Sequence, residues 1–272
     1  MLKRLIHRAI LTLSPQGAII TPRAHGIDIS KYDQYFYYAQ VTGQLDFIIQ
    51  RASYRTTRDQ LFDFMVGDVM SIPIRGAYHY LNSDTGWAAQ ADKFLTVVSP
   101  HNFHFYVCDF ESAVNVMSTA FARSAWDFIQ YVRSETGKPV LLYTSPSIYN
   151  SYITPSARAW ESIPLWNAQW NYTPNPNGTP KLPTGRTTWK IWQYTDSGMG
   201  KDLYGVARNG ACDLNVYNGS VAEMRAWLGV GGSTPPPAGD VDTPFPGVTR
   251  VRSDGVQVLT IAPDSIERVE IV

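Results

Sequence analysis

The chain has 272 residues, 44% of them hydrophobic, so it is long enough to bury a sizeable core in one large domain or two small ones. Its 23 basic and 23 acidic residues give a formal net charge of zero, which argues against a protein that holds nucleic acid or an anionic membrane surface by charge. No apolar stretch approaches the length of a transmembrane helix, and we expect no membrane insertion.

The N-terminus and the cysteines both indicate synthesis in the cytoplasm. Residues 1–24 are expected to form an N-terminal extension, a short amphipathic helix followed by a strand at residues 19–20. The apolar run at residues 9–13 is too short for the core of a signal peptide. Cys108 and Cys212 each precede an aspartate on a predicted strand, so both thiols point away from the face that carries the aspartates. A disulfide is therefore not expected.

From His25 onward, β-type and helix-type segments alternate. Strands are predicted at residues 25–29, 46–52, 74–80, 105–109, 139–144, 164–170, 189–194 and 212–216. The clearest helix, residues 119–136, carries one apolar stripe and is closed by Gly137, and another helix is predicted near residues 146–157. Eight strands with about five helices predict an α/β fold, an irregular TIM-like barrel. An open doubly wound sheet is the alternative.

The composition changes after Leu228. Residues 230–246 are rich in glycine and proline and are expected to be a linker that follows a catalytic domain at residues 25–229. The tail, residues 247–272, offers two β-type runs around Ser253-Asp254-Gly255 and a third near residues 266–271. A segment this short cannot form a core of its own, so it must pack on the barrel, self-associate or attach to a larger partner.

Two carboxylates end the strand predicted at residues 105–109. Asp109 and Glu111 are one residue apart, so their side chains project from the same face about 6.5 Å apart. This separation allows two carboxyl groups to flank one glycosidic bond. A strand that simply runs into a solvated acidic turn would have the same Asp-x-Glu pattern.

Further polar and aromatic residues fall on the other strands, at the ends that form the mouth of such a barrel. Asp28 ends the first strand, and Asp213 lies on the eighth, which is adjacent to the first in a closed barrel. Candidate substrate-binding residues from these strands are Tyr78, Tyr80, Tyr143, Trp166, Gln169, Trp192 and Gln193. This combination suits a neutral polymer rich in hydroxyl groups. His79, between two tyrosines, is expected to face the opposite way as a buried core histidine.

Several segments together resemble the family 25 glycoside hydrolases, the Chalaropsis-type lysozymes that include phage endolysins and bacterial autolysins. They occur in the family's order: Gly26-Ile-Asp28-Ile-Ser30, Phe47-Ile-Ile-Gln-Arg51-Ala52, Gly76-Ala-Tyr-His-Tyr80, Asp109-Phe-Glu111, Leu165-Trp166, Trp192-Gln193-Tyr194 and Asp213-Leu-Asn-Val-Tyr-Asn218-Gly219. The sequence differs from the family pattern at two places. The family often has Ser-x-x-Gln-Gly after the first aspartate, whereas here Ser30 is followed by Lys31-Tyr32-Asp33-Gln34-Tyr35, and Ser53 follows Arg-Ala in place of the frequent glycine.

The resemblance implies hydrolysis of the β-1,4 bond between N-acetylmuramic acid and N-acetylglucosamine in peptidoglycan, without a cofactor or metal. It implies that Glu111 is the general acid and Asp109 the carboxylate that assists the substrate's N-acetyl group, while Asp28 and Asp213 complete the site. The expected partner is the peptidoglycan glycan strand, and the tail is expected to bind another protein, the cell wall or itself. An endolysin, a virion-associated lysin and an autolysin all fit, each acting on the bacterial cell wall. The alternatives are a non-catalytic cell-wall binding protein on the same barrel and a glycosidase directed at chitin.

Overall fold

The computed structural model describes residues 12–13, 19–20, 22–33, 45–113, 115–170, 175–198, 212–231, 248–253 and 256–261. The chain divides into two compact units, Met1–Val230 and Gly231–Val272, which are described separately. Within the first unit, the expected strand at residues 19–20 is present as β2 (Ile19–Ile20), paired antiparallel with β1 (Thr12–Leu13). The helix expected before it lies outside the described residues.

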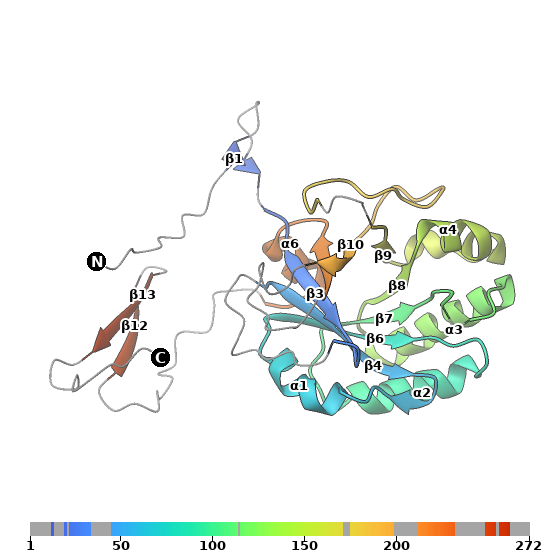
Figure 1. Ribbon diagram of the computed structural model, residues 1–272, viewed down its shortest axis with the longest axis horizontal. Coiled ribbons are helices and arrows are strands. Elements are labelled where there is room, and N and C mark those ends of the chain that lie inside the picture. The colour runs from blue at the N-terminus through green and yellow to red at the C-terminus, as the bar shows by residue number, and fades with distance from the viewer. Residues whose placement is uncertain are drawn as a thin grey trace. The chain divides into compact units, whose positions relative to one another are not determined.

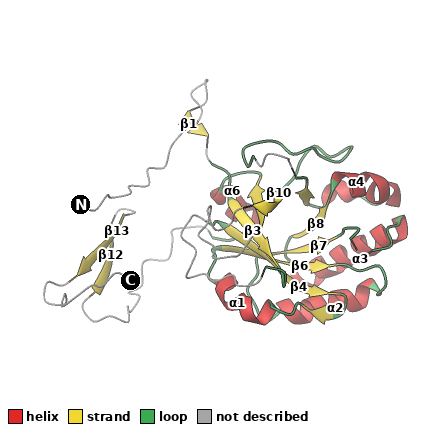
Figure 2. Ribbon diagram, in the orientation of Figure 1, coloured by secondary structure: helices red, strands yellow, loops and turns green. Residues whose placement is uncertain are grey.

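Eight strands of the first unit form a closed barrel (Figures 1 and 2). They are β3 (His25–Ile29), β4 (Phe47–Tyr54), β6 (Ile74–Tyr80), β7 (Phe105–Asp109), β8 (Val140–Thr144), β9 (Leu165–Ala168), β10 (Ile191–Gly198) and β11 (Cys212–Tyr217). The barrel closes because β3 pairs with β4 on one side and with β11 on the other. An open doubly wound sheet is thereby excluded. A short strand, β5 (Thr57–Arg58), extends β4 as an antiparallel hairpin.

The last strand, β11, runs in the opposite direction to the eighth strand of a regular TIM barrel, in which all strands are parallel. Strands β3 to β10 are parallel to their neighbours around the barrel, whereas β11 runs antiparallel to both β10 and β3. The first residues of β11 therefore lie at the same end of the barrel as the last residues of the other strands. This direction brings Asp213, the second residue of β11, to the level of Asp28, its register partner on β3.

Helices cover the outside of the barrel (Figure 2). They are α1 (Phe62–Met70), α2 (Trp87–Val98), α3 (Thr119–Thr136) and α4 (Pro146–Ile148), which continues as a π-helical turn at Tyr149–Ile153 and a 3₁₀ turn at Thr154–Ser156. A 3₁₀ turn at Trp160–Ser162 precedes β9. Helix α3 has the predicted bounds, because the Ser118 hydroxyl accepts a hydrogen bond from the Phe121 amide at its start and Gly137, at φ 66°, ends it.

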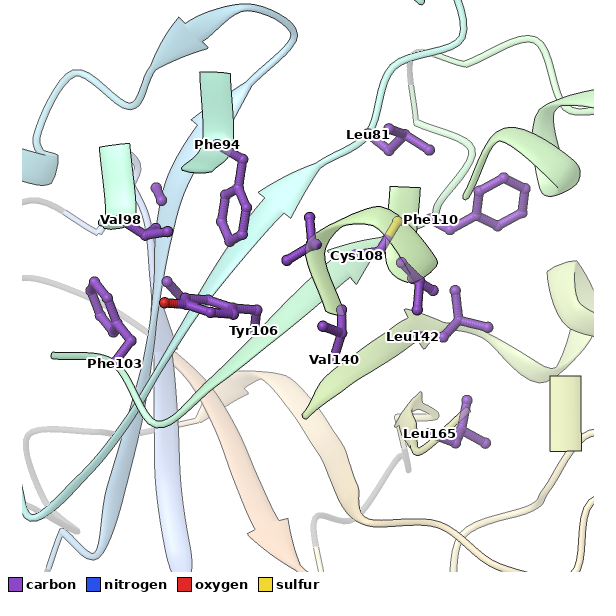
Figure 3. Close-up of a cluster of buried hydrophobic side chains, with 14 of the residues drawn as sticks. Leu81, Phe94, Val98, Phe103, Tyr106, Cys108, Phe110, Val140, Leu142 and Leu165 are labelled. Carbon is purple, nitrogen blue, oxygen red and sulfur yellow. The ribbon is translucent and has the colours of Figure 1, made fainter. Parts of the chain in front are cut away.

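The alternation of side chains along the strands separates two apolar cores. On β7, Phe105 and Val107 point into the barrel, while Tyr106 and Cys108 point out toward the helices. Figure 3 shows the outer core, where Phe94 of α2 and Tyr106 lie close together. Both cysteines are buried in this outer layer, as the strand alternation predicts.

His79 also faces the outer core, as expected. It is fully buried, and its ring contacts the Ser53 hydroxyl at 2.8 Å through Nδ1 and the Gln90 side-chain oxygen at 3.1 Å through Nε2. Burial lowers the pKa of His79 to about 4, and the hydrogen bond to Gln90 offsets part of this effect. Through these two hydrogen bonds the neutral imidazole of His79 links β6 to β4 and to α2.

Small and large residues alternate between neighbouring strands in the inner core. Gly26 on β3 is in register with Phe47 on β4, and Gly76 on β6 with Phe105 on β7. A Cβ atom at either glycine would lie 2.4 Å from the neighbouring phenyl ring. Helix α6 (Val221–Leu228), which begins with a Ser220 capping box, adds the buried Met224 to this core.

The second unit contains the hairpin β12 (Val248–Ser253) and β13 (Val256–Ile261), which agrees with the two β-type runs expected in the tail. The third run, near residues 266–271, lies outside the described residues. In the parts of the chain that the structure describes, no helix has both the length and the apolar character needed to cross a membrane.

Candidate active site

A cavity of about 450 Å³ opens at the end of the barrel where β3, β4, β6, β7 and β8 finish and β11 begins. All four carboxylates selected from the sequence line it. The complete lining is Asp28, Ser30, Lys31, Tyr32, Arg51, Tyr54, Thr57, Arg58, Asp59, Gln60, Tyr78, Tyr80, Asp109, Glu111, Ala113, Tyr143, Trp166, Trp170, Gln193, Asp196 and Asp213. The strand ends and the β4–β5 hairpin thus build one site.

Asp28 and Asp213 lie side by side on β3 and β11 and are held by two amide side chains. Asp28 Oδ1 accepts hydrogen bonds from Asn215 Nδ2 at 2.7 Å and from Gln193 Nε2 at 2.9 Å. Gln193 Nε2 also lies 3.2 Å from Asp213 Oδ2. Burial raises the pKa of Asp28 to about 6 against the lowering effect of the two amides, and burial with the nearby Asp28 charge raises the pKa of Asp213 to about 10. Burial and the closeness of the two carboxyl groups therefore disfavour a full negative charge on both of them.

Asp109 and Glu111 form the second carboxyl pair. Burial, followed by the charge of Glu111, raises the pKa of Asp109 well above its usual value. Burial also raises the pKa of Glu111, against a hydrogen bond with Tyr80 and the charge of Arg51. Burial is thus the largest cause that raises the pKa of both groups, and it disfavours two full charges in this part of the cavity.

A buried ion pair forms the wall next to Asp109. The Arg51 guanidinium at the end of β4 donates from Nε to Asp59 Oδ2 at 2.5 Å, and the two side chains are only 10% and 1% exposed. Asp59 also accepts from the backbone N–H groups of Leu61 and Lys31. Arg51 is thus held in one orientation while it lines the cavity.

Aromatic side chains connect the acidic groups to the barrel wall. Tyr143 donates its hydroxyl proton to Gln193 Oε1 at 2.9 Å, and Trp170 Nε1 donates to the same oxygen at 2.8 Å. Trp166 Nε1 donates to Asn215 Oδ1 at 2.8 Å. The cavity wall also contains two large exposed rings, Tyr32 at 74% and Trp170 at 53% exposure. Such rings offer flat apolar faces on which sugar rings can stack.

Two of the candidate substrate-binding residues do not reach the cavity. Trp192 is fully buried in the outer core, since it precedes the inward-facing Gln193 and side chains alternate along β10. Gln169 follows the end of β9, and its side chain bonds to the Trp170 carbonyl and to the Lys181 amide. The other five candidates line the cavity: Tyr78, Tyr80, Tyr143, Trp166 and Gln193.

The sequence analysis did not predict several residues that form or support the cavity. Asn215 could have been selected by alternation, because it lies two residues after Asp213 and shares its face. Arg51 could have been selected in the same way, because it lies two residues after Ile49 on β4 and shares the inward face of Phe47 and Ile49. Asp59 and Tyr32 lie in loops, where no periodicity predicts the direction of a side chain.

Within the described ranges, no three His, Cys, Asp or Glu side chains are grouped in a way that could hold a metal ion. The lining of the cavity offers carboxyl, amide, guanidinium and aromatic groups. Paired carboxyl groups with raised pKa values at the mouth of a β/α barrel define the site of a barrel glycosidase.

The chain belongs to the glycosyl hydrolases family 25, whose family model matches residues 27–203. It is a glycoside hydrolase. It is 26% identical over 234 residues to lysozyme M1 of Streptomyces globisporus, covering 77% of this chain and 73% of that protein. It is 28% identical over 214 residues to an N,O-diacetylmuramidase of Arthroderma benhamiae, covering 74% and 84%. The crystal structure of the bacterial lysozyme from Streptomyces coelicolor superposes with a TM-score of 0.62 at 27% identity, covering 78% of this chain and 98% of that one.

Proposed function

We propose that this protein is an N-acetylmuramidase, which cleaves the β-1,4 bond between N-acetylmuramic acid and N-acetylglucosamine in peptidoglycan and so contributes to lysis of the bacterial cell wall. The observation that carries the proposal is that Asp109 and Glu111 meet Asp28 and Asp213 in one cavity. The family and the two relatives, a lysozyme and a muramidase, support it.

In the proposed reaction, Glu111 donates its proton to the glycosidic oxygen as the bond from that oxygen to C1 breaks. The substrate's own N-acetyl oxygen attacks C1 from the other face, and Asp109 accepts a hydrogen bond from the N-acetyl N–H as positive charge develops there. A water molecule then attacks C1, the Glu111 carboxylate takes its proton, and the product keeps its original configuration. In the proposed reaction Asp109 is an anion, and Glu111 carries the proton when the substrate binds.

The remaining lining residues have positioning roles in this proposal. Asp28 and Asp213 orient the sugar through the network of Gln193 and Asn215. The rings of Tyr78, Tyr80, Tyr143 and Trp166 form the cavity walls against which the sugar packs. Gln169 and Trp192 have no role in it, since neither lines the cavity.

The test is incubation of the purified protein with isolated sacculi, followed by borohydride reduction and identification of the newly formed sugar alcohol. A muramidase produces muramitol. Glucosaminitol would indicate the wrong bond, and release of sugars from chitin but not from sacculi would favour the chitin-directed alternative. Binding to sacculi without any new reducing end would favour the non-catalytic alternative. The Glu111→Gln variant provides the blank for contaminating activity.

A further inference from the structure

The loop that carries Glu111 begins where the barrel strand ends. Asp109 is the last residue of β7, and its carbonyl accepts a hydrogen bond from the Leu81 amide at 3.0 Å. Glu111 lies two residues further on, and its backbone forms no hydrogen bond with the backbone of any described residue. The sheet therefore fixes Asp109 directly, whereas the position of Glu111 depends on the loop that follows.

One side-chain amide joins this loop to the loop that follows β6. Asn115 Nδ2 donates to the Glu111 carbonyl at 2.8 Å and to the Leu81 carbonyl at 3.0 Å. Asn115 Oδ1 accepts from the Ser83 amide at 2.9 Å. Both N–H groups and the oxygen of this half-buried side chain are thus bonded to backbone groups of the two loops.

The loop that follows β6 is itself fixed to helix α2. Gln90 of α2 is fully buried, and its Oε1 accepts from the Asn82 amide at 2.8 Å. Its Nε2 donates to the Asn82 carbonyl at 2.9 Å and to the Thr85 carbonyl at 2.7 Å. Residues 81–85 are therefore a firmly held support against which Asn115 can fix Glu111.

We propose that Asn115 is the positioning residue of the general acid. It holds the Glu111 carbonyl against residues 81–85 and so keeps the Glu111 carboxyl group within reach of the glycosidic oxygen. This inference rests on the proposed function, in which Glu111 donates the proton. A general acid acts over hydrogen-bond distance, and a displacement of about 1 Å can cost a factor of about 100 in rate. Asn115 does not line the cavity, so it acts through Glu111 and not by contact with the sugar.

The effect of removing Asn115 should depend on the leaving group, because only a leaving group that must be protonated needs the acid. On soluble peptidoglycan strands, Asn115→Ala should lower kcat by about 10- to 100-fold and change KM by less than about threefold. On an activated aryl glycoside, whose leaving group departs without a proton, the same variant should lose less than about threefold. A general loss of folded protein would lower both rates by the same factor.

A second variant and a matched control isolate the hydrogen bond to Glu111. Asn115→Asp retains an oxygen for the Ser83 amide but has no N–H group for the Glu111 carbonyl, so it should show the same dependence on the leaving group. Ser83→Ala removes the hydrogen bond from the Val116 amide to the Ser83 hydroxyl, which at 2.9 Å joins the same two loops without contacting Glu111. This control should keep both activities within about a factor of two.

The proposal is overturned if either Asn115 variant loses the same factor on both substrates, or keeps the wild-type kcat on glycan strands. Hydrogen–deuterium exchange of the full-length protein is a measurement that needs no substrate. In Asn115→Ala, the amides of Ser83 and Val116 should exchange about tenfold faster than in the wild type. Unchanged exchange would show that Asn115 does not hold the two loops together, and would overturn the proposal as well.

These outcomes are distinct from those that test the proposed function. A wild-type protein that releases no muramitol from sacculi would refute the muramidase proposal, while the exchange measurement would still show whether Asn115 holds the loop of Glu111. A muramidase whose activity and loop exchange are unaffected by the loss of Asn115 would refute only this inference.

Discussion

At the scale of single residues, the site contains two pairs of carboxyl groups, Asp28 with Asp213 and Asp109 with Glu111. Burial raises the pKa of all four groups, and hydrogen bonds from Asn215, Gln193 and Tyr80 together with the charge of Arg51 oppose that rise. Two of these groups, Asp28 and Asp213, are neighbours only because β3 and β11 pair. The chemistry of each carboxyl group is therefore set by its neighbours from other strands.

The first prediction separates the two central carboxyl groups. Glu111→Gln should remove nearly all turnover on peptidoglycan, because the leaving oxygen receives no proton, and should be partly rescued on an activated aryl glycoside whose leaving group needs none. Asp109→Asn should lose activity on both substrates. The measurement is hydrolysis of both substrates by both variants, and an equal loss on the two substrates for Glu111→Gln would show that Glu111 is not the acid.

The second prediction concerns Asp28, and its sign follows from the direction of the pKa shift. Burial raises the pKa of Asp28 to about 6, above its ordinary 3.8, so its stabilising contribution is fully present below pH 3.8 and is lost as the pH rises through 6. Asparagine has no proton to lose, and its oxygen can accept the hydrogen bonds from Asn215 and Gln193. Asp28→Asn should therefore lose much of the catalytic rate while gaining up to about 3 kcal/mol of stability at pH 7.

Urea unfolding of the wild type and of Asp28→Asn at pH 4 and pH 7 measures this gain. The difference in unfolding free energy should be large at pH 7 and small at pH 4. A difference that is the same at both pH values would mean that the ionisation of Asp28 does not destabilise the fold.

At the scale of elements, each barrel strand separates an inward face that ends in the site from an outward face that packs on the helices. On β7 the inward series is Phe105, Val107 and Asp109, so the apolar core and a carboxyl group of the cavity share one face. The glycines on neighbouring strands make room for the inward phenyl rings. Packing at the base of the barrel thus sets the positions of the strand ends at its mouth.

The third prediction tests this packing. Gly76→Ala should destabilise the protein by about 1 to 3 kcal/mol, because the new methyl group would lie 2.4 Å from the Phe105 ring at the start of the strand that carries Asp109. The control is Gly67→Ala in α1, where nothing lies within 4 Å of the added carbon and the helix should gain about 1 kcal/mol. Chemical unfolding of both variants measures the difference, and equal effects would contradict the packing argument.

At the scale of the whole molecule, eight strands close around one inner core while a second compact unit follows from Gly231. We propose that residues 25–229 are the catalytic domain, residues 230–246 a linker and residues 247–272 a tail used for targeting or assembly. Every residue that lines the cavity belongs to the first unit.

The fourth prediction follows from this division. A protein that ends at Gly229 should keep the midpoint of barrel unfolding and should cleave soluble glycan strands with a kcat/KM within about a factor of two of the full chain, since no group of the site is removed. Activity on intact sacculi is the companion measurement, and a selective loss there would assign the tail to targeting. A folded truncation that is inactive on soluble strands would place part of the tail in the site.

The sequence alone determined the strands and the longest helix, because periodicity and capping act over a few neighbouring residues. It also predicted Asp109 and Glu111 on one face, the outward thiols and the buried His79, since all of these follow from alternation along one strand. The tertiary structure alone decided the antiparallel direction of β11, the anchoring of Arg51 by Asp59 and the burial that raises the pKa values of the four carboxyl groups. Those features depend on burial and on contacts between residues far apart in the chain, as Asp28 and Asn215 are, and no local pattern encodes them.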